Sequence, residues 1–378
     1  MKLNSIGKAL GTTLSATALV TLTLTACGSD NNAGTSSPTS GAASGTNAAA
    51  AADCGGKNSV TAEGSTAQQN AIAEFNKVWG QTCSGKTLAY NPTGSGAGVD
   101  QFIAKQVDFA GSDSALSGDQ VAKAADRCGG NPAWNLPLVF GPVGMAFNVE
   151  GVDKLVVNGD VLAKIFQGQI KKWNDPAIAA LNSGATLPDA EIKPIYRSDS
   201  SGTTDNFQKY LGAAAPQSWT KGAGKEFQGG AGEGAQKSAG VVQAIQATPG
   251  AIGYVEKGFA QQAGLKLAQI DSGGGAVELT DESTQKAVDS AKFKADGMDL
   301  ALDLNALYAT KDAGVYPLML ATYEIVCSKG YDADTAAGVK SFLTVSANQG
   351  QANLSGAGYV PLPDAFKERL LKSVDAIA

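Results

Sequence analysis

The sequence predicts an α/β protein with two lobes, each a mixed, mostly parallel sheet flanked by helices. Three observations support this prediction. Short apolar runs of strand character alternate with segments of helical periodicity along residues 58–378. Clusters of Gly, Ser and Thr stand where predicted strands pass into predicted helices, which is typical of βαβ units. The length of 378 residues allows one or two domains with sizeable cores.

The first part of this alternation contains three strand–helix units. The predicted strands are residues 58–62, 87–90 and 107–110, and the predicted helices are residues 67–79, 99–105 and 116–125. In the first helix, Ile72, Phe75 and Trp79 recur at helical spacing. Residues 136–140 and 145–149 are two apolar runs separated by Gly141-Pro142, where we expect the chain to cross between lobes.

The second part continues in the same manner. The predicted helices are residues 161–166, 173–181, a segment ending at Tyr210, and residues 238–248, and the predicted strands are residues 192–196 and 251–255. A long apolar strand at residues 316–326 and an amphipathic helix at residues 364–377 return to complete the first lobe.

The absence of histidine and the net charge of −6 exclude several classes of function. Without histidine the chain lacks the commonest general base, the Ser-His-Asp triad and the commonest zinc ligand. A net acidic chain is a poor candidate for nucleic-acid binding, because phosphate backbones favour basic surfaces. We therefore expect no enzyme activity, no metal, no cofactor and no nucleic-acid partner.

The N-terminal segment is typical of export. Lys2 and Lys8 precede an apolar, Thr-rich stretch that ends in Leu-Thr-Ala-Cys at Cys27. This tetrad resembles a bacterial lipobox, so residues 1–26 are interpreted as a lipoprotein signal peptide and Cys27 as the lipidated residue. The alternative is an ordinary cleaved signal with an incidental cysteine. Residues 27–52 have the composition of a flexible tether. We expect an extracytoplasmic domain anchored to the outer face of the cell membrane.

The four later cysteines predict two disulfide bonds in an exported protein, with three connectivities. Cys54 and Cys83 each precede a predicted strand by a few residues. If those strands are parallel neighbours, both cysteines lie at the same sheet edge. This favours the pairing Cys54–Cys83 together with Cys128–Cys327.

Four polar clusters follow predicted strands, where open α/β sheets bind ligands. The clusters are Gly64-Ser65-Thr66, Gly94-Ser95-Gly96, Ser112-Asp113 and the segment from Arg197 to Thr203. Each brings hydroxyls and backbone N–H groups to a helix N-terminus, which favours anions. A single cluster of this kind is usually a helix cap. Four such clusters, one of which contains an arginine whose guanidinium can bind phosphate in a bidentate manner, indicate an oxyanion site.

Asp113 is the residue that selects among oxyanions. A carboxylate repels an anion unless the anion carries a proton that the carboxylate can accept. Phosphate near neutrality has such a proton and sulfate does not. Two facing acceptors would cost several kcal/mol, so Asp113 favours phosphate. The alternative role for Asp113 is the N-cap of the helix at residues 116–125.

The ordered motifs "GST", "TGSGAG", "DFAGSD" and "RSDSSGTTDNF", with "IFQGQIKKWNDPAIAALN" between the last two, resemble the high-affinity phosphate-binding proteins of bacterial ABC importers. The resemblance spans residues 58–378 and implies a two-lobed periplasmic-binding-protein fold of type II that closes over phosphate. It implies lobes at residues 53–138 plus 316–378 and at residues 139–315. By position, it assigns ligand contacts to Ser65, Thr66, Ala67, Ser95, Asp113, Arg197, Ser201, Gly202 and Thr203, with Asp199 supporting Arg197.

The predicted function is therefore capture of inorganic phosphate by a monomer and its delivery to the membrane subunits of an ABC permease. Two alternatives remain open at this point. One is a secreted phosphatase-type hydrolase with Ser201 as nucleophile, although no base for that serine is evident. The other is the same fold binding another oxyanion such as sulfate, against which Asp113 argues.

Overall fold

The computed structural model describes residues 53–378, which lie within one compact unit of residues 49–378. The strands of its main sheet are β1 (Ser59–Gly64), β2 (Thr87–Pro92), β3 (Phe109–Ser112), β4 (Ala133–Asn148), β5 (Val156–Val157), β6 (Lys193–Arg197), β7 (Glu233–Ala235), β8 (Ala251–Glu256), β9 (Lys266–Asp271), β10 (Ala276–Val277) and β13 (Met319–Cys327). A separate two-stranded ribbon consists of β11 (Lys292–Phe293) and β12 (Leu302–Asp303).

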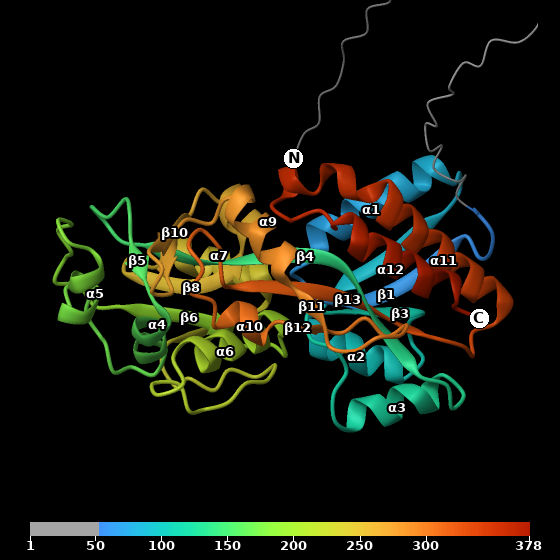
Figure 1. Cartoon of the computed structure of the whole chain (residues 1–378), viewed down its shortest axis with the longest axis horizontal. Helices are drawn as coiled ribbons and strands as arrows, with labels where there is room; N and C mark the ends of the chain where they lie inside the picture. The colour runs from blue at the N-terminus through green and yellow to red at the C-terminus, as the bar shows by residue number, and fades with distance from the viewer. Residues whose placement is uncertain (1–52) are drawn as a thin grey trace, which may run out of the picture. The chain divides into compact units, whose positions relative to one another are not determined.

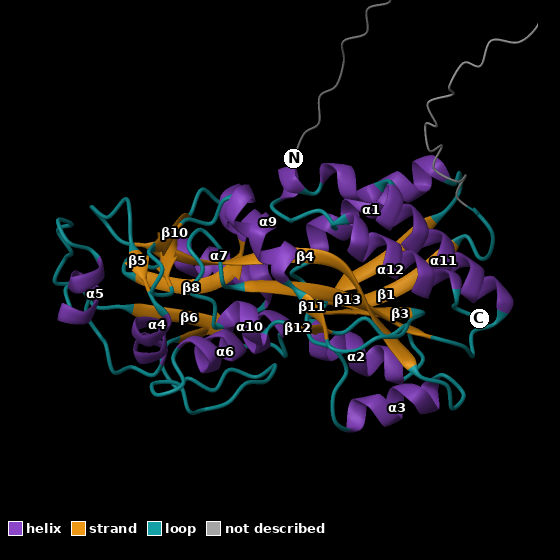
Figure 2. Cartoon of the chain, viewed as in Figure 1, coloured by secondary structure: helices purple, strands orange, loops and turns teal. Residues whose placement is uncertain are grey.

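The helices cover the sheet within this unit, as Figure 2 shows. They are α1 (Gln69–Thr82), α2 (Ser95–Ile103), α3 (Asp119–Arg127), α4 (Gly159–Phe166), α5 (Pro176–Leu181), α6 (Gly202–Ala214), α7 (Lys237–Ala247), α8 (Lys257–Gln262), α9 (Asp281–Ser290), α10 (Asn305–Tyr308), α11 (Ala333–Asn348) and α12 (Asp364–Asp375). Two short 3₁₀ helices, η1 (Gly350–Asn353) and η2 (Ser355–Ala357), join α11 to α12.

The main sheet has the strand order β2-β1-β3-β13-β4-β8-β6-β7. The pairs β2–β1 and β1–β3 are parallel, as are β8–β6 and β6–β7. Antiparallel pairings of β13 with β3 and β4, and of β4 with β8, join these two parallel groups. In Figure 1, β1 and β3 lie near α1 and α11, whereas β6 and β8 lie near α4 and α6. The predicted mixed α/β fold is confirmed.

Strand β4 corrects one detail of the prediction. The two apolar runs expected on either side of Gly141-Pro142 are a single strand of 16 residues. Its first part pairs with β13 as far as Pro142, and its second part pairs with β8 from Val143 onward. Pro142 has no N–H to donate, and the strand changes its partner directly after this residue. The Gly-Pro pair therefore marks a change of partner and not a break in the strand.

Most predicted elements are present with bounds shifted by a few residues. The largest shift at a helix start is that of α2, which begins at Ser95 and not at residue 99, and α5 begins at Pro176 and not at Trp173. Asp175 is its N-cap and accepts a hydrogen bond from the Ala177 backbone N–H at 2.9 Å, and Pro176 fills the first helical position. Trp173 is fully buried before the helix, and its Nε1 donates to the Gly250 carbonyl at 3.1 Å.

The core between α1 and α11 is aromatic. Trp79 and Phe342 meet edge to face with ring centroids 5.4 Å apart, and Phe109 stacks on the same Phe342 at 5.7 Å. All three side chains are fully buried. This packing covers the face of β1 and β3 with a rigid layer and so fixes the ends of these strands, where the polar clusters begin.

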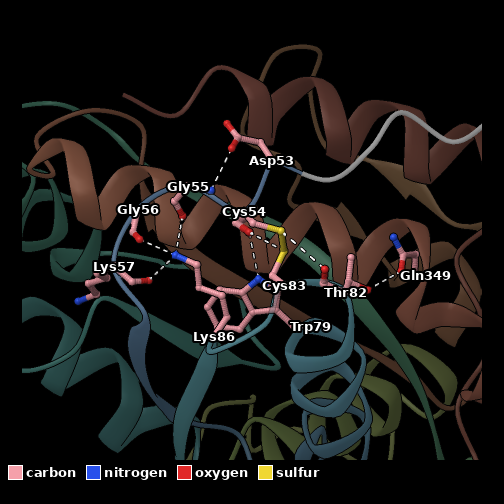
Figure 3. The surroundings of a disulfide bond; sticks show 11 residues. Asp53, Cys54, Gly55, Gly56, Lys57, Trp79, Thr82, Cys83, Lys86 and Gln349 are labelled. Carbon is pink, nitrogen blue, oxygen red and sulfur yellow. Dashed lines mark hydrogen bonds between the residues drawn. A yellow bond between two sulfur atoms is a disulfide. The ribbon is translucent and has the colours of Figure 1, made fainter.

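Both predicted disulfide bonds are present, Cys54–Cys83 and Cys128–Cys327. The parallel pairing of β1 with β2 brings the first two cysteines to one sheet edge, as expected. Figure 3 shows the Lys86 side chain beside this disulfide, with its ammonium directed at the backbone of residues 55–57. Its Nζ donates to the carbonyls of Gly55 at 2.9 Å, of Lys57 at 3.1 Å and of Gly56.

Candidate anion-binding site

Asp113 lies at the C-terminal end of β3 and is surrounded by hydroxyl groups. Its Oδ1 accepts hydrogen bonds from Ser65 Oγ at 2.6 Å and from Thr322 Oγ1 at 2.7 Å, and its Oδ2 accepts one from Ser95 Oγ at 3.0 Å. The Asp113 side chain is 3% exposed. The alternative helix-cap role is not observed, because α3 begins at Asp119 after Gly118 and has no side-chain cap.

The strand ends that carry these residues approach one another closely. The Ser65 backbone N–H donates to the Gly111 carbonyl at 2.8 Å. Gly64 has a φ of +142°, and a Cβ at this position would lie 2.0 Å from the Gly111 carbonyl oxygen. Glycine is therefore required at the end of β1 so that the following hydroxyls reach Asp113.

Arg197 ends β6 and is held by Asp199. Arg197 Nε donates to Asp199 Oδ1 at 2.7 Å and Nη2 donates to Oδ2 at 2.5 Å, a bidentate pair. The remaining nitrogen, Nη1, has only 3.5 Å contacts with the Thr203 and Ser238 hydroxyls. The guanidinium is thus fixed by its partner while one of its nitrogens lacks a short hydrogen bond.

The N-terminus of α6 contributes the third part of the site. Ser201 is its N-cap, and its Oγ accepts a hydrogen bond from the Thr204 backbone N–H at 3.2 Å. A Cβ added to Gly202 would lie 2.6 Å from both Asp113 Cβ and Ser95 Oγ. Only glycine therefore allows this positively polarised helix end to approach Asp113.

The structure brings all nine predicted ligand residues and Asp199 into one region. Asp113, Ser65 and Ser95 form one hydrogen-bonded group, and Arg197 with Thr203 forms a second. A 2.8 Å hydrogen bond between the Thr66 and Ser238 hydroxyls links the two groups, because Thr66 follows Ser65 in the chain and Ser238 Oγ lies 3.5 Å from Arg197 Nη1. Ala67 lies beside them, and its backbone N–H donates to Ser65 Oγ at 3.0 Å.

Three further residues of the region were missed by the sequence analysis. Thr322 donates to Asp113 from the middle of β13, and Ser238 contacts Thr66 from α7. Glu256 accepts a hydrogen bond from Thr203 Oγ1 at 2.6 Å and is 2% exposed. An acidic residue directly after the predicted strand at residues 251–255 was a signal for Glu256. Ser238 stands at the start of the predicted helix at residues 238–248, which was also a signal, whereas Thr322 lies inside a predicted strand and has none.

Burial and neighbouring groups shift the pKa values of the charged residues in this region in different directions. Burial raises the pKa of Asp113 to about 6, although the Ser65, Thr322 and Ser95 hydroxyls act in the opposite direction. Burial also acts against the charged guanidinium, but the hydrogen bonds and charge of Asp199 outweigh it and raise the pKa of Arg197. The pKa of Asp199 is lowered: Arg197 outweighs the opposing effect of burial. Arg197 and Asp199 therefore form a firmly ionised pair.

Ser201 lacks the surroundings of a nucleophile. Its hydroxyl accepts the helix-capping hydrogen bond, and the sequence has no histidine that could serve as its base. Among residues 53–378 no group of three or more Asp, Glu or Cys side chains is arranged to hold a metal ion. In the same part of the chain, no helix is long and apolar enough to cross a membrane.

Comparison with known proteins agrees with this architecture. The model of the PBP superfamily domain matches residues 33–349. The phosphate-binding protein PstS 3 of Mycobacterium tuberculosis is 49% identical over 380 residues, with both chains covered completely. The phosphate-binding protein PstS of Pasteurella multocida is 30% identical and covers 76% of this chain and 81% of its own.

The fold is also shared with a solved structure. The high-affinity periplasmic phosphate-binding protein PfluDING, solved with phosphate, aligns with a TM-score of 0.65 over 82% of this chain and 92% of its own. At 24% identity this likeness supports the fold alone. From the superfamily match and the extent of identity to the mycobacterial relative, we conclude that this chain belongs to the PBP superfamily and to the PstS group of substrate-binding proteins within it.

Proposed function

We propose that this protein binds inorganic phosphate outside the cytoplasm and delivers it to an ABC permease. The observation that carries the proposal is the buried guanidinium of Arg197, which Asp199 holds while Nη1 keeps only 3.5 Å contacts. A permanently charged, pre-oriented donor of this kind suits a tetrahedral oxyanion. The names of the PstS relatives, all phosphate-binding proteins, support the same ligand.

The proposed phosphate contacts are the residues assigned by resemblance. They are Ser65, Thr66, Ala67, Ser95, Asp113, Arg197, Ser201, Gly202 and Thr203, with Asp199 as the support of Arg197. In this proposal the Ser65 and Ser95 hydroxyls turn toward phosphate oxygens, and Asp113 accepts the proton of the ligand. The hydrogen bonds among these side chains support the proposal, since the Ser65 and Ser95 hydroxyls both lie within hydrogen-bond distance of the Asp113 carboxylate.

The proposed contribution of Arg197 is tested by substitution. Arg197→Ala is expected to weaken phosphate binding by about 100-fold or more, because a buried charge-assisted contact is lost and Asp199 is left unpaired. Arg197→Lys keeps the charge but loses the fork, so it should fall between wild type and alanine. Isothermal titration with inorganic phosphate, after any co-purified ligand has been removed, measures these affinities.

Arg369→Ala is the matched control. Arg369 is a residue of α12 outside the proposed site, and its guanidinium lies over the ring of Phe293. Its affinity for phosphate should equal that of the wild type. Unchanged phosphate affinity in Arg197→Ala would show that the binding site lies elsewhere.

We further propose that residues 53–138 plus 316–378 and residues 139–315 are lobes that close over the ligand. Contacts between the two sets support this, including the Gly96 N–H to the Ser200 carbonyl at 3.0 Å and Asn206 Nδ2 to the Asp113 carbonyl at 2.7 Å. Small-angle scattering should give a monomeric mass and a smaller radius of gyration with phosphate than without it. An unchanged radius would contradict hinge closure.

The proposed membrane anchor depends on Cys27, which lies outside the described residues, as do the signal peptide of residues 1–26 and the tether of residues 27–52. We propose that lipidated Cys27 holds the domain at the outer face of the membrane. Metabolic labelling with radioactive palmitate should mark the wild type and leave Cys27→Ser unlabelled. Equal labelling of both proteins would exclude Cys27 as the acceptor.

A further inference from the structure

Glu256 brings a second buried carboxylate to the proposed phosphate site. It is the last residue of β8 and directly precedes α8. Its Oε1 accepts a hydrogen bond from Thr203 Oγ1 at 2.6 Å, and Thr203 in turn lies 3.5 Å from Arg197 Nη1. The carboxylate of Glu256 is thus one hydroxyl group away from the guanidinium that is proposed to bind phosphate.

The second oxygen of Glu256 has no partner among the described residues. Glu256 Oε2 is buried and makes no hydrogen bond, although the side chain is only 2% exposed. A buried acceptor without a donor is costly, so native structures rarely retain one without a functional reason. A donor supplied by the ligand would satisfy this oxygen.

The charges around Glu256 leave an excess of negative charge before any ligand binds. The charged and titratable groups that face Glu256 or adjoin it are Arg197 of β6, Asp113 after β3, Tyr359 after η2, Lys257 of α8 and Asp281 of α9. Lys257 Nζ is bound to Asp281 at 2.5 Å, and Arg197 is already paired with Asp199. The two cations are therefore already paired with other carboxylates. Among the described residues, neither Asp113 nor Glu256 forms an ion pair, although Arg197 acts on Glu256 and Lys225 acts on Asp113 through their charges.

Two carboxylates on one anion site favour a ligand that carries two protons. Each proton turns a repulsive contact between two acceptors into a charge-assisted hydrogen bond. Inorganic phosphate has a monobasic form with two hydroxyl groups and a dibasic form with one. We propose that Glu256 is a specificity-determining residue that accepts a second ligand proton, so that the site prefers monobasic phosphate. This inference rests on the proposed function.

The proposed acceptor is supported by the other carboxylate of the site. Burial raises the pKa of Asp113 to about 6, and the charge of Glu256 acts in the same direction. The two carboxylates therefore act on one another. A protonated ligand between them reduces this repulsion, because each carboxylate faces an O–H group instead of bare negative charge.

The test is the pH profile of phosphate binding in wild type and Glu256→Gln. In the wild type, affinity for inorganic phosphate should fall as the pH rises through the second ionisation of phosphate, since the monobasic form is depleted. In Glu256→Gln the amide can donate to a deprotonated phosphate oxygen, so the profile should flatten. At the acidic end the variant should bind about tenfold or more weakly, because one charge-assisted hydrogen bond is lost.

The glutamine variant distinguishes recognition of a ligand proton by Glu256 from a purely structural hydrogen bond between Glu256 and Thr203. Its amide oxygen can still accept the Thr203 hydrogen bond, so a purely structural role of Glu256 would leave the pH profile unchanged. Glu368→Gln, an exposed glutamate of α12, is the matched control and should reproduce the wild-type profile. Isothermal titration of the full chain with inorganic phosphate, below and above its second ionisation, gives the profiles.

Each outcome has a distinct consequence. A flattened profile in Glu256→Gln and an unchanged one in Glu368→Gln would support the inference. A wild-type affinity without pH dependence, or a Glu256→Gln profile identical to that of the wild type, would overturn the inference while phosphate binding itself stands. No phosphate binding by the wild type at any pH would overturn the proposed function together with it.

Discussion

Asp113 shows how a single residue connects stability with recognition. Its carboxylate is buried at the end of β3, and its hydrogen-bond partners are neutral hydroxyls of Ser65, Ser95 and Thr322. Neutral donors compensate only part of the lost hydration of a charged group. The residue that is proposed to recognise the ligand proton therefore destabilises the ligand-free fold.

The pKa of Asp113 predicts the pH range of this cost. Burial raises it from 3.8 to about 6, so within this window the folded protein binds more protons than the unfolded chain. The contribution of Asp113 to the free energy of unfolding is therefore largest below this pH window. It decreases as the pH rises through the window and remains lower above it. The difference between these two pKa values corresponds to about 3 kcal/mol of folding free energy. Asp113→Asn should escape this loss.

Denaturant unfolding of ligand-free wild type and Asp113→Asn across the acidic range measures the effect. As the pH rises from about 4 to about 6, the unfolding free energy of the wild type should decrease relative to that of Asp113→Asn. The hydrogen bonds changed by the substitution add a constant offset, which does not affect this slope. A difference that stays constant across the window would contradict the raised pKa.

At the scale of elements, the disulfide bonds fix the two edges of the strand group that contains β1 and β3. Cys54–Cys83 links residues 29 positions apart, whereas Cys128–Cys327 links residues 199 positions apart and connects the end of α3 to the end of β13. In the chain-entropy account, the longer loop gives the larger restriction of the unfolded chain.

Removing Cys128–Cys327 by a double alanine substitution should therefore destabilise the protein more than removing Cys54–Cys83. The loop lengths give about 5 and about 4 kcal/mol as upper values. The difference between the two stability losses should be larger still, because Cys128 and Cys327 are fully buried and their truncation leaves cavities, whereas Cys54 is exposed. Chemical unfolding of the two double variants provides the comparison, and an equal or reversed order would contradict it.

Local chemistry explains which elements and site residues the sequence could predict. Ser65, Ser95 and Asp113 each directly follow a strand or begin a helix, so a window of a few residues contains their signal. Arg197 and Asp199 are two positions apart and form their bidentate pair without help from distant segments. The strand–helix alternation is likewise a short-range pattern, and it predicted the α/β fold correctly.

The missed features depend on pairing between distant segments. Thr322 reaches Asp113 only because β13 pairs with β3, bringing together residues 209 positions apart in sequence. Ser238 meets Thr66 across a separation of 172 residues. The continuity of β4 through Gly141-Pro142 depends on β13 and β8, which supply successive partners. None of these pairings leaves a pattern within one local window.

At the scale of the whole described unit, the proposed site lies where the two parallel strand groups meet. Asp113 and Ser95 come from the group of β1, β2 and β3, whereas Arg197 and Thr203 come from β6 and α6. The antiparallel pair of β4 and β13 joins these groups. A ligand that binds residues from both groups would couple its binding to their relative position.

The central claim is that the protein selects phosphate over other oxyanions. Calorimetric titration of the purified, ligand-free protein with phosphate, sulfate and a phosphate ester tests it directly, with Asp113→Asn as the comparison. We expect phosphate to bind at micromolar or tighter affinity, sulfate to bind far more weakly, the ester to remain unhydrolysed, and Asp113→Asn to narrow the gap between phosphate and sulfate. Equal binding of sulfate and phosphate by the wild type, or no binding of phosphate, would contradict the claim.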